Sequence, residues 1–477
     1  MKWNALVVGS GPNGLAAAIR LSQAGWRVRV AESAAKPGGG CRTADLTLPG
    51  FCHDVCAAAH PLGVASPYFR SLNLYDYGLN WKNPEVVLAH PTLDGDAAGL
   101  YRSIVKTTAG LGADGEAWAE LISPLVENFD DLLEDILRPP GLPAHPLVTG
   151  RFALNALRSA KSLADSFFRT QKAKTLFCGL AAHAKLPLTE SISASFGLVL
   201  GAAAHAVGWP VAEGGSAKII DALLATLTKL GGEVITDAEV TTASDIEKFA
   251  PGAKTALFDI TPRQLLRIMG DLGPAAYRAK LSAFRYGSGV FKLDYALSEQ
   301  IPWNNELCRK AGTVHLGSSA EEIILSEKCT ARGRQPERPY VIVVQPTLVD
   351  PSRAPEGKHI AWAYCHAPAA STTDITRVVE NQIDRYAKGF RDTILGRHLM
   401  DSMAMEKYNP NYIGGDIGSG AQDLRQTIWR PFRTGNPYRM PIPGWYICSA
   451  STPPGGGVHG MCGFNAAEQV LTDAGGS

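Results

Sequence analysis

Residues 5–32 read ALVVGSGPNGLAAAIRLSQAGWRVRVAE, and this stretch decides the fold. A short apolar strand leads into a G-x-G-x-x-G turn, an alanine-rich helix follows, and a second strand ends at an acid. Gly9 allows the chain to turn sharply out of the strand, Gly11 allows the backbone to approach a pyrophosphate, and Gly14 allows the helix to pack closely on the sheet. The stretch therefore predicts a dinucleotide-binding unit.

The polar residues of this unit agree with that interpretation. The start of the helix, next to Ser10, offers free N–H groups and the positive end of the helix dipole to an anion. Glu32 follows the second strand, where a carboxylate accepts hydrogen bonds from the two hydroxyls of an adenosine ribose, and Ser33 comes next. An acid at this position argues against a 2′-phosphate. The alternative is a glycine-rich turn with a purely structural role.

The composition excludes several classes of protein. The 477 residues carry 46 Lys and Arg against 45 Asp and Glu, which gives a net charge of +1. This near-neutral charge, without a basic run, predicts that the chain binds neither DNA nor RNA. No apolar stretch reaches the roughly 18 to 20 residues that a membrane span needs, and no export signal is visible. We therefore expect a cytoplasmic protein, with peripheral membrane contact through an amphipathic stretch as an alternative.

Cysteine is not expected to form a disulfide framework, because the nine cysteines are odd in number and scattered. Four residues in one short stretch do have the types and spacing of zinc ligands: Cys52, His53, Cys56 and His60. The three-residue gap between these cysteines is uncommon in zinc sites, and the alanines that follow indicate buried packing. We predict no metal, with zinc at this stretch as the alternative.

The rest of the chain indicates a discontinuous organisation. Apolar residues at three- and four-residue spacing from about 113 to 208 predict a helical insert, and a glycine-bounded helix and strand at 210–240 return to an α/β layer. We predict an α/β fold in which a Rossmann-like domain is built from discontinuous segments, beside a mixed α+β substrate domain with a helical lid. The predicted boundaries are 1–80, 210–275 and 435–477 for the first domain, and 81–209 and 276–434 for the second.

Two more glycine-rich loops resemble ligand-binding devices. The loop AAKPGGGCRT at 34–43 places Gly39 and Gly40 before Arg42, which suits a backbone that lies along a ligand. Near the C-terminus a strand at 445–450 runs into a glycine-rich loop, and a helix begins near Gly463. Because these devices stand at opposite ends of the chain, we expect one long ligand, with its pyrophosphate at Gly9 to Gly14 and its other end at 457–461.

The order of these motifs resembles the flavin amine oxidase and phytoene desaturase superfamily. The segments YGSGVFKLDYALSEQIPW (286–303), DPSRAPEGKHIAWAY (350–364) and STPPGGGVHGMCGFNAA (451–467) are most similar to its phytoene dehydrogenase-related group. The resemblance implies FAD, bound non-covalently in an extended form. The residues it assigns to the cofactor are Gly9, Ser10, Gly11, Gly14, Glu32, Ser33, Gly39, Gly40, Arg42, Thr43, Val240, Ser451, Gly457, Val458, Gly460 and Met461.

Two residues are the candidates for catalysis. Lys292 resembles the lysine that amine oxidases place beside flavin N5, where it orients or activates a water. The alternative is a lysine that reaches solvent from a strand edge. His459 precedes the last helix, and its imidazole is a plausible proton acceptor near the flavin or the substrate. The alternative for His459 is a hydrogen bond that orders the loop.

The resemblance implies an FAD-dependent oxidoreductase. Our main hypothesis is a dehydrogenase or desaturase that transfers a hydride from a hydrophobic small molecule to flavin N5, with oxygen or another acceptor taking the electrons. One alternative is an oxidase that releases hydrogen peroxide, with an amine as a candidate substrate. A further alternative is a flavin-binding protein that acts through a partner. Bound NAD(P) is not expected, because no second nucleotide-binding βαβ unit can be recognised in the sequence.

Overall fold

The computed structural model describes residues 2–475, and its first sheet has the expected Rossmann-like order. All of its neighbouring strands run parallel, and we call it the parallel sheet. The fold class predicted from the sequence is confirmed, since strands from both ends and the middle of the chain meet here. In sheet order these strands are β16 (Trp445–Ile447), β10 (Thr255–Phe258), β1 (Ala5–Val8), β2 (Val28–Ala31) and β9 (Glu233–Ile235).

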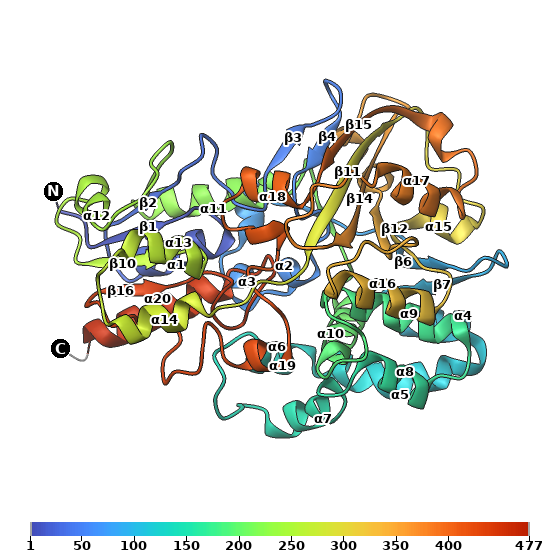
Figure 1. Ribbon diagram of the computed structural model, residues 1–477, viewed down its shortest axis with the longest axis horizontal. Coiled ribbons are helices and arrows are strands. Elements are labelled where there is room, and N and C mark those ends of the chain that lie inside the picture. The colour runs from blue at the N-terminus through green and yellow to red at the C-terminus, as the bar shows by residue number, and fades with distance from the viewer. Residues whose placement is uncertain (1, 476–477) are drawn as a thin grey trace.

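Two helices from opposite ends of the chain pack together on this sheet. They are α1 (Pro12–Gln23), which joins β1 to β2, and α20 (Met461–Gly475) (Figure 1). Two glycines allow this packing: Gly14 lets α1 lie close to the turn after β1, and Gly463 lets α20 lie close to α1. A Cβ at Gly14 would lie 2.1 Å from the carbonyl oxygen of Gly9, and one at Gly463 would lie 1.8 Å from that of Asn13. Close packing of backbone on backbone therefore joins the two predicted loops.

A second sheet, which we call the mixed sheet, is antiparallel except for the parallel pair of β12 and β6. It has seven strands, two of which are β11 and β13. Its order is β15 (Ile394–Met400), β11 (Gly289–Leu297), β14 (His359–Ala367), β13 (Val341–Val344), β12 (Ala311–Leu316), β6 (Val86–Pro91) and β7 (Ala97–Leu100).

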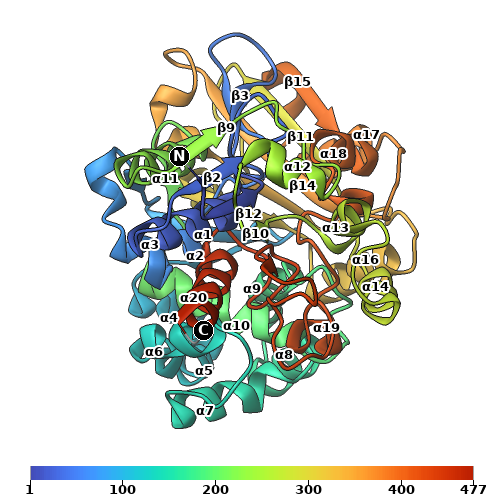
Figure 2. The same cartoon turned by 90° about the vertical axis from the view of Figure 1, so that its left-hand side faces the viewer.

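The helical insert gathers on one side of the molecule in both views (Figures 1 and 2). The spacing of apolar residues does not reveal helix α9, because most of its residues are buried and it has no polar stripe. The members of the insert are α4 (Ile104–Leu111), α5 (Gly115–Glu127), α6 (Phe129–Ile136), α7 (Pro146–Ala156), α8 (Ala160–Phe167), α9 (Gln171–Ala182) and α10 (Ser193–Ala206). The domain boundaries given above stay a prediction.

The remaining elements connect these layers. No helix in the described part of the chain has the length and apolar character that a bilayer crossing requires. The short strands are β3 (Thr43–Asp45), β4 (Cys52–Asp54), β5 (Trp81–Lys82) and β8 (Val211–Ala212). The other α-helices are α2 (Pro61–Ala65), α3 (Pro67–Ser71), α11 (Ala217–Lys229), α12 (Ser244–Phe249), α13 (Pro262–Met269), α14 (Ala275–Ser282), α15 (Glu306–Lys310), α16 (Ala320–Ala331), α17 (Thr376–Asp384), α18 (Ser402–Tyr408) and α19 (Leu424–Ile428).

One buried carboxylate ties several of these segments together. Asp54 on β4 accepts hydrogen bonds from the Thr43 hydroxyl at 2.9 Å and from the Ser216 N–H at 2.7 Å. Its other oxygen pairs with Arg353 at 2.9 Å, and both charged side chains are fully buried. Because each charge is compensated and hydrogen-bonded, the pair can stay ionised in the interior. The hydrogen bonds of Asp54 fix the hairpin of β3 and β4 to the start of α11 and to the segment before β14 of the mixed sheet.

The contact between α1 and α20 can be tested by adding one methyl group. Gly463→Ala places a Cβ against the fixed backbone of Asn13, so we expect the free energy of unfolding to fall by about 1–3 kcal/mol. Gly150→Ala in α7 is the matched control, since its Cβ meets open space and alanine favours a helix by about 1 kcal/mol. Urea unfolding curves measure both. Equal stability of the two variants would contradict the packing.

Candidate functional site

A cavity of about 710 Å³ opens between the parallel sheet, the mixed sheet and the helical insert. Its wall includes the glycine turn after β1, the loop after β2, the apolar side of the insert and the loop before α20. The structure thus brings both predicted loops to one continuous space. The predicted residues that line it are Gly9, Ser10, Gly11, Glu32, Ser33, Gly39, Gly40, Arg42, Val240, Gly457, Val458 and His459.

The glycine turn closes around a carboxylate that sequence reasoning missed. Asp259 follows β10, and its Oδ2 accepts a hydrogen bond of 2.8 Å from the Gly14 N–H at the start of α1. Gly9 has a φ of +98°, and a Cβ on Gly9 or on Gly11 would lie 2.9 Å from an oxygen of Asp259. The position of Asp259 could have been predicted, because β10 neighbours β1 and parallel strands end at the same edge of the sheet.

The protonation of Asp259 depends on its surroundings. Burial raises the pKa of Asp259 to about 7, the Gly14 N–H opposes this rise, and the negative charge of Glu32 adds to it. The carboxyl group therefore changes charge near neutral pH. It lies in the cavity wall beside the turn where a pyrophosphate is expected.

Glu32 is already fully engaged by the chain. Its Oε2 accepts from the Ser10 N–H at 3.1 Å and from the Ser10 hydroxyl at 2.5 Å. Its Oε1 accepts from the Ala34 N–H at 2.9 Å and from Arg42 at 3.1 Å. A carboxylate offers about four acceptor positions. A ribose hydroxyl that binds Glu32 therefore has to replace one of these partners, and the side-chain donors are the Ser10 hydroxyl, Arg42 and, at 3.5 Å, the Ser33 hydroxyl.

The glycine loop after β2 packs directly on the turn after β1. Gly39 has a φ of +55°, and a Cβ there would lie 3.1 Å from the Cα of Gly11. Arg42 extends over the ring of Tyr408, with its guanidinium carbon 5.6 Å from the ring centre. Thr43, in contrast, turns its hydroxyl to Asp54 and accepts from the Ala217 N–H, so it lies outside the cavity wall.

The loop before α20 is ordered by His459. The Met461 N–H donates to Nδ1 of His459 at 3.1 Å, so the proton of the neutral ring is on Nε2. Burial lowers the pKa of His459 to about 4, against backbone hydrogen bonds at Gly456 and Gly455 that raise it. His459 is thus neutral at pH 7 and holds the loop in place. Of the other predicted residues, Gly14, Ser451, Gly460 and Met461 do not line the cavity.

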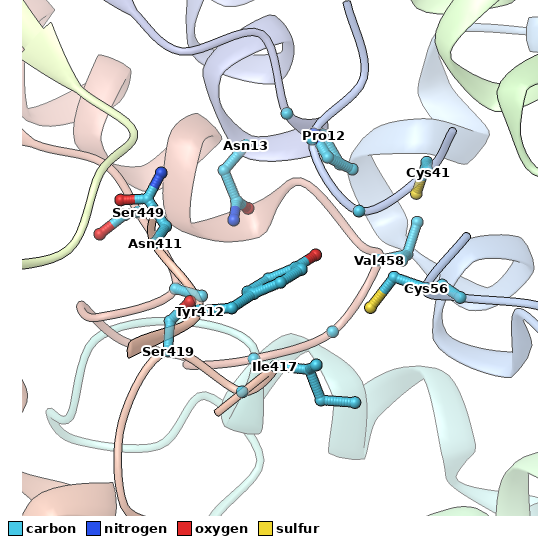
Figure 3. Close-up of a pocket in the computed structure, with 18 of the residues that line it drawn as sticks. Pro12, Asn13, Cys41, Cys56, Asn411, Tyr412, Ile417, Ser419, Ser449 and Val458 are labelled. Atoms are coloured by element: carbon cyan, nitrogen blue, oxygen red, sulfur yellow. The ribbon is translucent and has the colours of Figure 1, made fainter. Parts of the chain in front are cut away.

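A segment between β15 and β16, residues 408–422, contributes a wall that the sequence did not indicate. Figure 3 shows the Tyr412 ring crossing the cavity toward Cys56 and Val458. A side chain at Gly40 would collide with the Tyr412 hydroxyl. Burial raises the pKa of this phenol well above its ordinary value, so Tyr412 is a neutral hydrogen-bonding group.

The mixed sheet and the insert make the cavity largely apolar beyond these loops. Trp362 and Tyr364 from β14 line it with ring centres 4.9 Å apart and planes at 62°. Aromatic residues of the cavity wall thus come from β14. The apolar residues that the insert adds include Ile136, Leu137, Phe152, Ile192, Phe196, Val199 and Leu200.

Lys292 lies behind this wall. Its side chain is fully buried, so the alternative of a solvent-reaching lysine is wrong. Its Nζ pairs with Asp294 at 2.5 Å and lies 5.7 Å from the ring centre of Trp362. Burial tends to raise the pKa of Asp294, but Lys292 and His398 outweigh it, and that pKa lies below its ordinary value. Lys292 does not line the cavity, and a catalytic role for it stays a prediction.

The residues considered as zinc ligands are engaged elsewhere. His53 hydrogen-bonds to Thr47 at 2.8 Å, and His60 to Ser216 at 2.8 Å. Within residues 2–475, no three His, Cys, Asp or Glu residues are placed so that they could hold a metal ion. The nine cysteines are all free thiols.

Known proteins are similar to this chain in sequence and in fold. Residues 7–77 match the family model of the NAD(P)-binding Rossmann-like domain. The chain is 23% identical over 558 aligned residues to pyridine nucleotide-disulfide oxidoreductase domain-containing protein 2 of Rattus norvegicus, with 99% of this chain and 94% of that protein covered. The resemblance inferred from the sequence motifs is confirmed by this match over nearly the whole chain.

Solved structures confirm the fold. An oxidoreductase of Methanosarcina mazei has a TM-score of 0.64 at 18% identity, with 98% of this chain and 100% of that chain covered. Cyclohexylamine oxidase of Brevibacterium oxydans has a TM-score of 0.60 at 13% identity, and both chains are fully covered. The chain therefore shares the fold of these two proteins.

A double substitution separates the two roles of Lys292. Lys292→Met leaves Asp294 buried without its main partner, so the free energy of unfolding should fall by about 3–5 kcal/mol. Adding Asp294→Asn removes the stranded charge, and most of this loss should return in urea unfolding. If Lys292 only balances Asp294, the double variant keeps its activity. An active-site lysine predicts a stable but inactive double variant.

Proposed function

We propose that the protein is an FAD-dependent oxidoreductase that dehydrogenates or desaturates a hydrophobic small molecule. One observation carries this proposal. The cavity runs without interruption from the glycine turn to the loop before α20, and then along the apolar wall of the insert. A dinucleotide cofactor and an apolar substrate can therefore meet in it.

The residues at the glycine turn fit such a cofactor. The start of α1 faces the cavity, and Oδ1 of Asn13 is buried there without a hydrogen-bond partner within residues 2–475. Gly9 and Gly11 let Asp259 pack closely against this turn, and Gly39 lets the next loop pack on Gly11. These positions would hold the diphosphate, Glu32 and Ser33 the ribose, and Val240 the adenine. Gly457 and Val458 would border the flavin ring.

When bound, FAD supplies a hydride acceptor at N5 of its ring. The chain supplies orientation and a dry environment. Trp362, Tyr364 and the insert give a surface on which an apolar substrate can lie, and its burial excludes water. His459 keeps the C-terminal loop fixed through its bond to the Met461 N–H. Since the pKa of His459 is lowered to about 4, His459 takes up no proton between pH 5 and pH 8.

An oxidase is the second candidate function. It is favoured by the shared fold with cyclohexylamine oxidase, whose name states an amine substrate. The apolar residues of the insert favour a lipophilic substrate over a charged amine. The two functions differ in their by-product, since the oxidase releases hydrogen peroxide.

Absorbance spectroscopy tests the proposal. The protein reconstituted with FAD should show a flavin absorbance band at about 450 nm, and the flavin should stay with the protein on gel filtration. Under anaerobic conditions a lipophilic substrate should bleach the band, and peroxide formation on admission of air identifies an oxidase. Gly11→Ala, whose Cβ collides with Asp259, should weaken FAD binding, while Gly110→Ala in open space should not. Failure of the unmodified protein to retain FAD would refute the proposal.

The affinity for FAD should depend on pH through Asp259. Above pH 7 this carboxyl group is ionised and repels the diphosphate, whereas below pH 7 it is neutral. We expect the Kd for FAD, measured by fluorescence quenching, to rise about tenfold from pH 6 to pH 8. Asp259→Asn should remove this rise. A rise that persists in Asp259→Asn would assign the dependence to another group.

A further inference from the structure

A pair of histidines meets where the insert packs on the mixed sheet. His183 ends α9 and lines the cavity, while His315 lies on β12 behind it. Their Nε2 atoms are 3.2 Å apart, and their ring centres are 5.1 Å apart. The indole of Trp209, also in the cavity wall, packs edge-on against His183 with ring centres 5.6 Å apart. The pair is thus held in a fixed orientation.

Both imidazoles are neutral. Burial lowers the pKa of His183 to about 3 and that of His315 well below its ordinary value. A neutral imidazole has one donor and one acceptor nitrogen. Between the two Nε2 atoms one ring donates and the other accepts. The nitrogen of the pair that remains for a ligand is Nδ1 of His183, since Nδ1 of His315 is buried.

His90 closes the inner end of this arrangement. Its Nε2 is 2.8 Å from the carbonyl oxygen of Gly317, so it must donate, and its Nδ1 is a bare acceptor. A Cβ on Gly179 would lie 2.9 Å from Nδ1 of His90 and 3.0 Å from Nδ1 of His315. Both nitrogens are buried without a partner within residues 2–475. The proton of His315 can therefore sit on either nitrogen, and Nδ1 of His183 is an acceptor in one case and a donor in the other.

A hydroxyl group satisfies both cases, because it donates and accepts. A hydrocarbon satisfies neither, and it would leave the imidazole nitrogen of His183 without water or a partner. A group with hydrogen-bonding capacity is therefore expected on the part of the substrate that lies against His183.

A carboxylate does not fit this wall as well. Lys185, the nearest cation along the chain, lines the cavity but already pairs with buried Asp416. Asp416 is further held by the N–H groups of Gly287, Gly418 and Gly420 at 2.8, 2.9 and 2.8 Å. The charge of Lys185 is thus compensated, so Lys185 is not a free cation for an anionic substrate.

We propose that the substrate is a lipophilic alcohol whose hydroxyl group hydrogen-bonds to Nδ1 of His183. Its apolar part lies along Phe196, Val199 and Leu200 of α10. This inference rests on the proposed function, since it concerns the substrate of the same cavity. His183 then determines specificity, and His315 positions its ring.

Matched isoprenoid ligands test the proposal. Farnesol and farnesene have the same number of carbon atoms and differ chiefly in the hydroxyl group, while farnesoic acid carries a carboxylate. Binding to the FAD-loaded protein can be followed by tryptophan fluorescence, because Trp209 and Trp362 line the cavity. We expect farnesol to bind about tenfold more tightly than farnesene, as one net hydrogen bond predicts. Farnesoic acid should bind more weakly than farnesol.

Variants of His183 test whether this residue causes the preference for farnesol over farnesene. His183→Phe should lower the affinity for farnesol about tenfold and leave that for farnesene unchanged, so that the preference disappears. His183→Gln keeps a donor and an acceptor and should retain part of it. His205→Gln is the control, because His205 is a buried histidine outside the cavity that accepts from Trp118 at 3.1 Å. Thermal unfolding checks that each variant is folded.

Two results would overturn the proposal. One is equal affinity of the unmodified protein for farnesol and farnesene, and the other is an undiminished preference in folded His183→Phe. The fluorescence comparison works with or without FAD. A protein that fails to bind FAD but prefers farnesol through His183 would refute the proposed function and keep the alcohol site.

Discussion

The close approach of backbone to backbone at the start of α1 is the constraint on which the rest of the structure depends. Gly14 rests on the carbonyl of Gly9, and Gly463 of α20 rests on the carbonyl of Asn13. These contacts place the two ends of the chain against the same helix. The loop before α20 therefore opens into the space that the glycine turn begins. Without this contact the two predicted loops would not share one cavity.

Buried charges provide the second level of order. Asp54 with Arg353 and Lys185 with Asp416 join distant segments around the cavity, while Lys292 and Asp294 form a buried ion pair within β11. Such pairs add little net stability, but the loss of one partner is costly. They therefore fix relative positions. His459, Tyr412 and His183 are neutral polar groups of the cavity wall.

Local patterns predicted much of the fold and part of the site. The turn at 9–13, Glu32 and the loop at 457–459 belong to short sequence motifs, and all of them line the cavity. Asp259 could have been found from the order of parallel strands. His183 and His315 could not, because the two residues lie far apart along the chain and only packing of α9 on the mixed sheet brings them together.

The same limit explains Lys292 and Thr43. A strand pattern indicates that Lys292 is on a buried strand, but it does not show that the ammonium group of Lys292 forms an ion pair with Asp294. Thr43 follows Arg42 in a loop that contacts the cavity, yet its hydroxyl turns to Asp54. For Thr43 the buried carboxylate is on the neighbouring strand, and for Lys292 it is two residues away on the same strand. Family resemblance gives the position of a residue in the fold, whereas its partners come from packing.

The central claim is that one dinucleotide spans the cavity from the glycine turn to the loop before α20. Hydrogen–deuterium exchange with and without saturating FAD tests it most directly. The account predicts that FAD slows exchange at 9–14, at 32–42 and at 457–461 together. Slower exchange at only one end of the cavity, or no change at either end, would contradict it.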